Sequence, residues 1–325
     1  MQRFKNILCV IEIDSEGSTL ERAVTLAENN QACLTVAVVI DETPPNTKLF
    51  DRVLSPFDLQ TKIVEEYQQR LENLINPCKK RVEIQSKVLI GIPFLEVIKE
   101  VLRNDRDLVI KEAEDDELLY GLFGSYDMHL LRKCPCPVWL VKSDSPKVYK
   151  RILAAVDVGN YYPPEELNSR NQTNLQILEI ACSLAIPDFA ELHVVHVWEA
   201  IGESALRVGF IQRPEEEVTS YVKELREQNS QNLNILMDEV ISKFGQDSLE
   251  YLKPITHLLK GSPRKDIPDF ANENKIDLVV MGTIARTGIS GLIMGNTAET
   301  ILNKLNCSVL AIKPPGFETP VIVED

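Results

Sequence analysis

The sequence predicts an α/β protein with two tandem doubly wound domains, each a five-stranded, mostly parallel sheet with helices on both faces. Short apolar, β-branched runs alternate with longer runs of helical periodicity, the pattern typical of parallel sheets. This pattern stops at a short polar linker with a proline, residues 143–147, and then begins again. A chain of 325 residues is also long enough for two separate cores.

In the first half, strands are predicted at residues 5–13, 34–40, 82–89, 108–110 and 138–141. Each is a short run dense in apolar residues, as expected of a parallel strand buried on both faces. Helices are predicted at residues 21–30, 56–75, 94–102 and 127–132. The second of these carries an apolar stripe at helical spacing, formed by Leu59, Ile63, Tyr67, Leu71 and Leu74.

The second half repeats the first segment by segment. KRILAAVDV at 150–158 corresponds to KNILCVIEI at 5–13, and DLVVM at 277–281 corresponds to DLVIK at 107–111. A strand at 192–197, a long helix at 214–243 and a GSPRKDIPDFA segment at 261–271 also have first-half counterparts. A tandem duplication follows, with domain 1 at 1–142, domain 2 at 148–315 and a C-terminal tail at 316–325.

The order of the elements and several motifs of the chain resemble those of the universal stress protein family, in particular its tandem members. The similar motifs are the Val156–Asp157 pair that ends a strand, RTGIS at 286–290, GNTAE at 295–299, LLRKCP at 130–135 and the KP…TPV…ED ending. The resemblance covers nearly the whole chain and depends on the joint order of these motifs. It implies a non-enzymatic stress-response protein of the cytoplasm.

Residues 277–313 read as strand, glycine loop, helix and strand. Nucleotide-binding members of the family have a loop of the pattern G-x2-G-x9-G-(S/T) here. Glycine suits such a loop because a Cβ would intrude where the backbone approaches phosphate oxygens, and a helix N-terminus then attracts the anion. Gly282 and Gly295 take the first and third glycine positions, whereas Ala285 replaces the second glycine and Asn296 replaces the hydroxyl, with Thr297 directly after it.

Three further residues extend this candidate site. Arg286 lies beside the loop, where a guanidinium group would pair with phosphate. Asp157 ends the first strand of domain 2, where a carboxylate accepts hydrogen bonds from adenine or ribose. The resemblance implies a main-chain contact to the base at Val197. A helix-capping role for Asp157 is weakly supported, because the next helix is expected to start only after an insertion at 159–173.

Domain 1 has a degenerate loop. Its sequence there, KEAEDDELLYGLFGS, is rich in carboxylates that would repel a triphosphate: Glu112, Glu114, Asp115, Asp116 and Glu117. Gly124 and Ser125 remain and read as a helix start. Glu12 corresponds to Asp157. We interpret domain 1 as a partner domain that does not bind nucleotide.

The bulk composition excludes some partners. The net charge is −14, which argues against nucleic acid and against an anionic membrane surface. Seven cysteines are an odd number, and the sequence places Cys9, Cys33, Cys182 and Cys307 in strands or on helix faces, as reduced and buried thiols. The CPCP segment at 134–137 reads as a strand entry and not as a zinc site. His193 and His196 are predicted on opposite faces of a strand, and His129 and His257 are predicted to be isolated.

Two hypotheses follow, and a third is poorly supported. In the first, domain 2 is a regulatory module that binds ATP, AMP or a related small molecule. In the second, the loops are scaffold, and the protein binds an apolar ligand or a protein partner without nucleotide. The third hypothesis, a phosphate-transferring enzyme, is poorly supported because the sequence contains no Walker A lysine motif. The last strands of the domains, 138–141 and 309–312, are expected to pair within one chain as a pseudo-dimer, and further homo-oligomerisation stays open.

Overall fold

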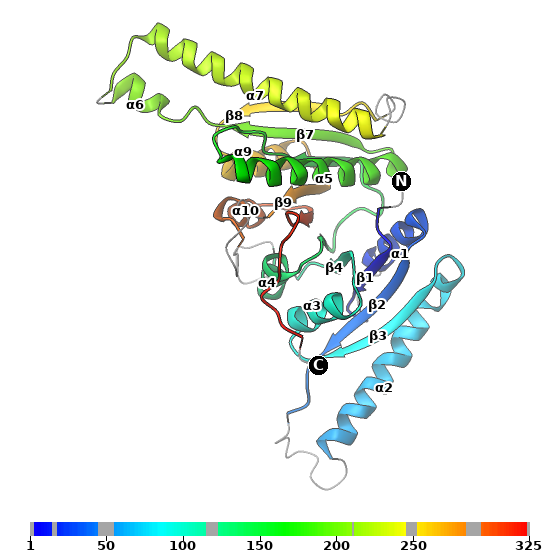
Figure 1. The fold of residues 1–325 in the computed structure, drawn as a ribbon. Coiled ribbons are helices and arrows are strands. Elements are labelled where there is room, and N and C mark those ends of the chain that lie inside the picture. Colours follow the sequence, from blue (N-terminus) through cyan, green and yellow to red (C-terminus); the bar gives the residue numbers. More distant parts are fainter. Residues whose placement is uncertain are drawn as a thin grey trace. The chain divides into compact units, whose positions relative to one another are not determined.

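The computed structural model describes residues 3–14, 18–44, 55–114, 123–209, 211–244, 252–283 and 294–323. The chain divides into two compact units. Unit 1 comprises Met1–Lys147 together with Glu318–Asp325, and unit 2 comprises Val148–Phe317. Both units contain the predicted alternation of strands and helices (Figure 1).

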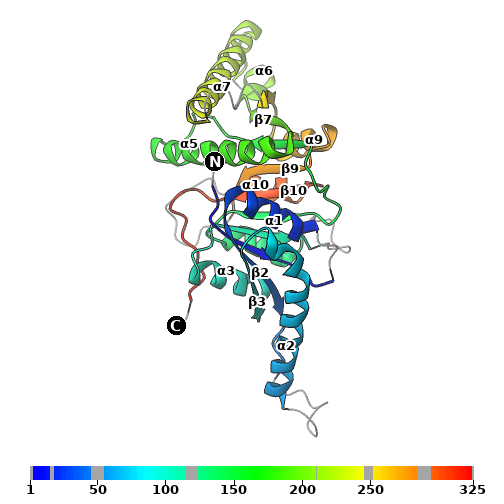
Figure 2. The ribbon, with the colours of Figure 1, turned by 90° about the vertical axis from the view of Figure 1, so that its right-hand side faces the viewer.

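Unit 1 is a parallel sheet in the order β3-β2-β1-β4-β5. Its α2 helix runs alongside β3 and β2 (Figure 2). Ser55 caps α2 by accepting a hydrogen bond from the Asp58 N–H at 3.1 Å, and Pro56 takes the first helical position. The elements are β1 (Asn6–Val10), α1 (Ser18–Asn30), β2 (Cys33–Ile40), α2 (Pro56–Ile75), the 3₁₀ turn η2 (Asn76–Lys80), β3 (Ile84–Ile90), α3 (Pro93–Arg103), β4 (Leu108–Glu112), α4 (Ser125–Lys133) and β5 (Val138–Val141).

Unit 2 repeats this topology with a parallel sheet in the order β10-β9-β6-β7-β8. The order of the strands reverses beside the first strand of the unit, β6, as in other doubly wound sheets. Its elements are β6 (Arg151–Ala155), α5 (Pro164–Asp188), β7 (Glu191–Trp198), α6 (Glu203–Val208), α7 (Glu215–Phe244), β8 (Ile255–Lys260), α9 (Pro263–Glu273), β9 (Leu278–Gly282), α10 (Asn296–Leu302) and β10 (Ser308–Ile312).

The two units share one device that holds the start of their first strand. In unit 1 the Asp107 carboxylate accepts a hydrogen bond from the Lys5 N–H at 2.6 Å. In unit 2 the Asp277 carboxylate accepts one from the Lys150 N–H, also at 2.6 Å. The aspartate of the repeated DLV motif therefore satisfies a main-chain donor at the same place in both units.

Helices cover both faces of the unit 2 sheet. On one face α5 contacts α7, and on the other α9 contacts α10. The side chains of β7 alternate between these layers, because His196 is hydrogen-bonded to Asn229 of α7 whereas His193 packs against Phe270 of α9. The predicted opposite facing of the two histidines is confirmed.

Most elements lie where the sequence predicts them. The α2 helix and β5 have the predicted bounds, and the other first-half elements agree within a few residues. The expected late start of the first helix of domain 2 is wrong, because α5 begins at Pro164, within the 159–173 insertion. The short α6 helix was not predicted. The pairing of strands 138–141 and 309–312 concerns the placement of one unit against the other and stays a prediction.

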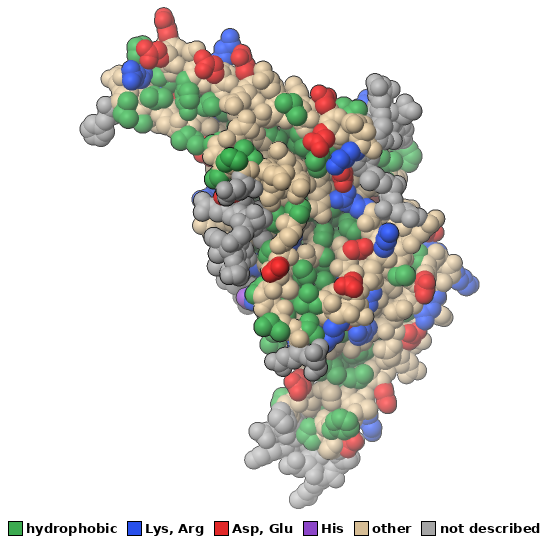
Figure 3. Space-filling view, in the orientation of Figure 1, with side chains coloured by type: hydrophobic (Ala, Val, Ile, Leu, Met, Phe, Trp, Pro, Cys, Tyr) green, Lys and Arg blue, Asp and Glu red, His purple; other side chains and the backbone are tan. Residues whose placement is uncertain are grey.

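Acidic side chains lie along the outer surface of α7 among lysines and arginines (Figure 3). Glu215, Glu216 and Glu217 at its first turn are exposed, as expected for a solvated helix face with a favourable dipole interaction. Among the helices of the described segments, none combines the length and apolarity that a bilayer crossing requires.

Candidate functional site

A cavity of about 890 Å³ lies in unit 2 at the carboxyl ends of its strands. Ala155, Val197 and Met281 from the ends of β6, β7 and β9 line it, together with the residues that begin α9 and α10. Ligands of open α/β sheets bind at this end, where the order of the strands reverses. The volume lies within the range of small-molecule sites.

Six of the predicted site residues line this one cavity: Asp157, Val197, Gly282, Gly295, Asn296 and Thr297. They lie at or just beyond the ends of β6, β7 and β9 and at the start of α10, so the fold brings together residues that are distant in sequence. Ala285 and Arg286, the other two predicted residues, lie outside the described residues. Arg264, which the sequence reasoning missed, also lines the cavity.

One end of the cavity suits an anion. Pro263 and Arg264 begin α9, and the Arg264 Nε donates a hydrogen bond to the Thr297 hydroxyl at 3.3 Å. Pro263 has no N–H, and the Lys265 and Asp266 N–H groups donate to the Ser262 carbonyl. The start of α9 therefore favours an anion mainly because the positive end of the helix dipole adds to the arginine charge. The Asp266 carboxylate lies against Gly261, in the space that a Cβ at this position would occupy. Its negative charge offsets part of this positive potential.

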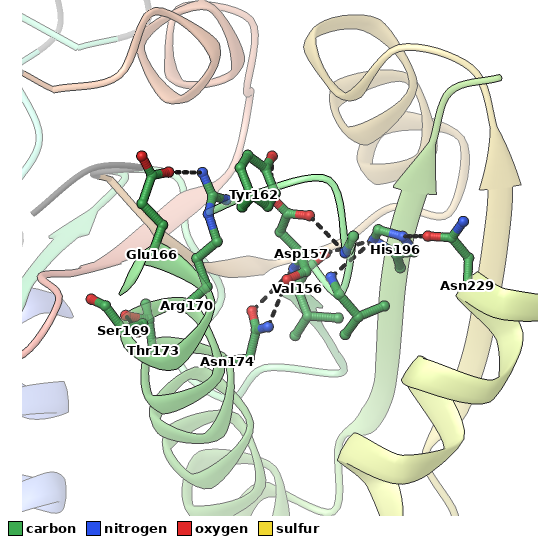
Figure 4. Close-up of polar contacts among 12 residues, drawn as sticks. Val156, Asp157, Tyr162, Glu166, Ser169, Arg170, Thr173, Asn174, His196 and Asn229 are labelled. Atoms are coloured by element: carbon green, nitrogen blue, oxygen red, sulfur yellow. Dashed lines mark hydrogen bonds and ion pairs between the residues drawn. The ribbon is translucent and has the colours of Figure 1, made fainter. Parts of the chain in front are cut away.

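The opposite end is formed by Asp157 and the start of α5 (Figure 4). Its carboxylate accepts hydrogen bonds from the Tyr162 hydroxyl at 2.9 Å and from the Arg170 guanidinium at 2.5 Å. Its other oxygen accepts from the Gly159 N–H at 3.2 Å. Asn174 of α5 fixes the main chain of Asp157, because its amide accepts from the Asp157 N–H at 3.0 Å and donates to the Asp157 carbonyl at 2.7 Å.

Two tyrosines lie beside this ion pair and line the cavity. The Arg170 guanidinium stacks on the Tyr162 ring, 3.3 Å from its centroid. The Tyr161 ring packs at 4.5 Å from the Tyr162 ring, and 58% of Tyr161 remains exposed. Burial, together with the negative charge of Asp157, raises the pKa of both phenols. Both hydroxyls are therefore protonated donors at neutral pH.

Gly282 has a structural reason to be glycine. A Cβ at this position would lie 3.2 Å from the Thr173 methyl group and 3.9 Å from the end of the Ile177 side chain, both on α5. The first distance is tighter than ordinary van der Waals packing. The glycine therefore admits α5 against the end of β9, whether or not a phosphate also approaches it.

The site position of unit 1 contains an ion cluster. Lys111 of β4 is paired with the buried Asp127 of α4 at 2.8 Å and with Glu114 at 3.3 Å. The Asp127 carboxylate also accepts from the Glu114 N–H at 2.7 Å, and the Glu114 side chain lies against Gly124. Burial opposes the charge of Lys111, but the two carboxylates raise its pKa. Asp115, Asp116 and Glu117 lie outside the described residues.

The predicted isolation of His257 is wrong. Its Nε2 lies 3.0 Å from the Nδ1 of His193 on the neighbouring strand, and the Phe270 ring packs edge-on against both imidazoles. Burial lowers the pKa of both histidines, which favours the neutral rings. One of the two facing nitrogens then carries a proton and donates it in a hydrogen bond to the other. In unit 1, His129 stacks on Phe94 with ring centroids 4.7 Å apart.

All seven cysteines are thiols outside any disulfide. Cys9 and Cys182 are buried as predicted, whereas Cys33 is exposed and Cys307 is half-buried, which corrects the expectation of buried thiols. The Cys134 and Cys136 sulfurs lie 3.6 Å apart. Within the described ranges, no group of three or more metal-ligating side chains converges on one point.

Comparison with known proteins agrees with the repeated architecture. A sequence model of the universal stress protein family matches residues 3–142 and 149–313. A universal stress protein E homolog of Haemophilus influenzae is 32% identical over 323 residues, covering 96% of this chain and 98% of the relative. Universal stress protein E of Escherichia coli is 34% identical over 235 residues, covering 72% of this chain and 69% of the relative.

Solved structures share the fold. A Pseudomonas aeruginosa protein of unknown function matches with a TM-score of 0.67 at 24% identity, covering 96% of this chain and 94% of the other. A universal stress protein of Archaeoglobus fulgidus matches with a TM-score of 0.59 at 19% identity, covering 95% and 98%. The sequence motifs of this chain also resemble the universal stress protein E subgroup, and the relatives confirm that prediction.

Proposed function

The chain belongs to the universal stress protein family, and on this premise we propose that it is a non-enzymatic stress-response protein whose unit 2 binds an adenine nucleotide, ATP or AMP. The main support is the convergence of Asp157, Val197, Gly282, Gly295 and Asn296 on one cavity. A mere turn in the chain would not require residues of three strand ends and a helix start to line a common space.

The two ends of the cavity suggest how the ligand lies. The phosphates are assigned to the end with Arg264, Thr297 and the start of α9, where a guanidinium and the positive end of the helix dipole favour an anion. The base is assigned to the end with the exposed face of Tyr161, on which a planar ring would stack. Ile177 and Ile301 add apolar surface to the lining between them.

We propose binding without turnover. The sequence has no Walker A lysine motif, and the functional residues assigned above bind and orient without supplying a base for an attacking water. In this proposal the protein acts in the cytoplasm as a nucleotide-responsive module. Unit 1 contributes no nucleotide site, because Lys111, Asp127 and Glu114 fill the corresponding position with their own charges.

Isothermal titration calorimetry of the full chain with ATP and AMP tests the proposal. We expect saturable heat for the wild-type protein and weaker ATP binding for Arg264→Gln. The matched control is Lys265→Gln, which removes an equal charge from the next, exposed residue that does not line the cavity. The absence of heat for both nucleotides at millimolar concentration would refute nucleotide binding.

A second candidate function is the binding of an apolar ligand. Met281, Met294 and Ile267 line the cavity, and the space beside Gly282 is already used by α5. Both observations favour a ligand with apolar surface and without a triphosphate. Mass spectrometry of protein purified from untreated cells separates the candidates, since a co-purified nucleotide would exclude this one and a co-purified lipid or apolar metabolite would support it.

A further inference from the structure

The Asp157 carboxylate already has its hydrogen-bonding partners within the protein. One oxygen accepts from the Tyr162 hydroxyl and from Arg170, and the other accepts from the Gly159 N–H. A carboxylate offers about four lone-pair positions, so three protein donors leave about one, on the oxygen that accepts from the Gly159 N–H. The group that the sequence predicts to read the base is therefore engaged before a ligand arrives.

We propose that Arg170 determines the base specificity of the cavity by keeping the Asp157 carboxylate in an ion pair. Because this carboxylate is then not offered to the base, the cavity binds a 6-amino purine and a 6-oxo purine equally well. This inference rests on the proposed nucleotide binding. It contradicts the simple expectation that Asp157 accepts a hydrogen bond from the amino group of adenine. The base would instead be held by stacking on Tyr161, which is blind to the exocyclic group.

Arg170 is fixed from several sides. Its guanidinium stacks on Tyr162, and its second terminal nitrogen lies 3.9 Å from the Glu166 carboxylate one helical turn earlier. Only 12% of its side chain is exposed, compared with 38% for Asp157. A planar, permanently charged group held by a ring and two carboxylates is costly to displace, because its charge would lose partners in a partly dry site.

The ligand therefore meets the ion pair and not a free carboxylate. To bond with the amino group of adenine through the oxygen that accepts from Arg170 and Tyr162, Asp157 would first have to release one of these donors, and that exchange returns little net energy. A 6-oxo purine, which presents an acceptor at the same position, loses nothing by comparison. The remaining contacts, stacking on Tyr161 and the phosphate end at Arg264, are common to both nucleotides.

The first experiment needs no ligand. The melting temperature is measured for the wild type, Asp157→Asn, Arg170→Gln and the double variant. We expect strong non-additivity: Arg170→Gln lowers the melting temperature of the wild type, but hardly lowers that of Asp157→Asn, because the pair is already broken. Additive decrements would mean that the two side chains are not coupled in solution and would overturn the inference, whatever the protein binds.

The second experiment compares AMP with inosine monophosphate by calorimetry. We expect wild-type dissociation constants within about threefold of each other, and a preference of about tenfold for AMP in Arg170→Gln, since a freed carboxylate then accepts from the amino group. Tyr162→Phe, which removes one donor and keeps the ring, is expected to give a smaller preference of the same sign. It serves as the second variant if Arg170→Gln folds poorly.

Arg264→Gln is the matched control, because it removes an arginine from the same cavity without touching Asp157. It is expected to weaken both nucleotides equally and to leave their ratio unchanged. A tenfold preference for AMP in the wild type, or an unchanged ratio in both Arg170→Gln and Tyr162→Phe, would overturn the inference. Failure of the wild type and of every variant to bind either nucleotide would instead refute nucleotide binding itself, and the melting experiment would still decide whether Arg170 holds Asp157.

Discussion

At the same place in the repeated fold, unit 1 has an ion pair and unit 2 has a cavity wall. Lys111 and Asp127 of unit 1, paired at 2.8 Å, correspond to Met281 and Ala298 of unit 2. Met281 and Ala298 carry no charge and line the cavity. The duplicated sheet is the same in both units, so a few side chains at the end of one strand and the start of one helix decide whether space remains for a ligand.

The two units also differ at the residues that precede α4 and α10. In unit 1 the Glu114 side chain lies against Gly124, the residue that precedes α4. Burial raises the pKa of this carboxyl group, although Lys111 opposes the shift. A carboxyl group therefore occupies the space beside the helix start that, in unit 2, belongs to the cavity at Gly295. Unit 1 satisfies its helix start with the Glu114 carboxylate, which accepts from the Tyr126 N–H, whereas the corresponding residue of unit 2, Ile284, has no charge and lies outside the described residues.

A second pair of positions differs in the same way. His193 and His257 of unit 2 correspond to Thr35 and Lys87 of unit 1, and Phe270 corresponds to Glu100. Unit 1 thus has a buried carboxylate with a lysine at 2.6 Å where unit 2 has two neutral imidazoles against a ring. The same position in the fold therefore has an ion pair in unit 1 and a pair of histidines in unit 2.

The largest effect is expected from breaking the ion pair of unit 1. Asp127→Ala leaves Lys111 charged and nearly buried without its main partner, which costs about 3–5 kcal/mol of the free energy of unfolding. Urea denaturation measures this loss. The control is Asp14→Ala, which breaks an exposed pair with Arg70 and is expected to cost no more than about 1 kcal/mol. Similar losses in the two variants would contradict the comparison.

The next largest effect is expected from placing the ion pair of unit 1 in the cavity of unit 2, which tests whether this pair alone prevents ligand binding. Met281→Lys combined with Ala298→Asp transfers the unit 1 pair into unit 2. We expect ATP affinity to fall by about tenfold or more, because the introduced side chains fill the cavity wall and a carboxylate repels phosphate. Calorimetry measures the affinity, and Met281→Leu with Ala298→Ser is the uncharged control. Unchanged affinity in the charged variant would place the ligand elsewhere.

The fold was predictable from the sequence because its signals are repeated. Apolar runs of strand length appear twice in the same order, and the two copies support each other where one is weak. The gathering of Asp157, Val197 and Gly282 was predictable as well, because all three end parallel strands whose carboxyl ends meet at one edge. These predictions need no knowledge of side-chain partners.

The partners of Asp157 were not predictable in that way. Pro163 and Pro164 indicate an interruption of regular secondary structure. The polar residues after them show no apolar residues at helical spacing, so the insertion reads as a loop. The available signal was Glu166 and Arg170 at helical spacing directly after a proline pair, which indicates a helix start. Which carboxylate Arg170 would reach depends on the packing of α5 against the sheet. The His193–His257 pair likewise depends on the register of β7 and β8.

Acid is expected to destabilise unit 2 through its histidine pair. Burial lowers the pKa of His193 and His257 below the ordinary value of 6.5, with Glu191 opposing and Arg151 adding to the shift at His193. The unfolded chain therefore binds protons that the folded chain does not as the pH falls below 6.5, and the melting temperature should fall by several degrees toward pH 5. Differential scanning calorimetry over this range measures it.

Two variants sharpen the pH prediction. His257→Phe keeps a ring against Phe270 and removes one titrating group, so the fall in melting temperature with acid should become shallower. Glu191→Gln removes the carboxylate that favours a charged His193, lying 3.8 Å from its Nε2, so the fall should become steeper. A pH profile that neither variant changes would mean that other groups determine the acid sensitivity.

The smallest effect concerns Gly282, for which unit 1 has Glu112. If the glycine serves the packing of α5, Gly282→Ala should cost about 1 kcal/mol of unfolding free energy, because the new methyl group meets the Thr173 methyl group at 3.2 Å. Adding Thr173→Ser removes that methyl group, keeps the hydroxyl that donates to the Ser169 carbonyl, and should restore stability. Chemical denaturation and ATP titration of both variants then separate the two roles of the glycine. Full stability with lost ATP binding in Gly282→Ala would assign the glycine to the phosphate, whereas lost stability that Thr173→Ser restores assigns it to the helix.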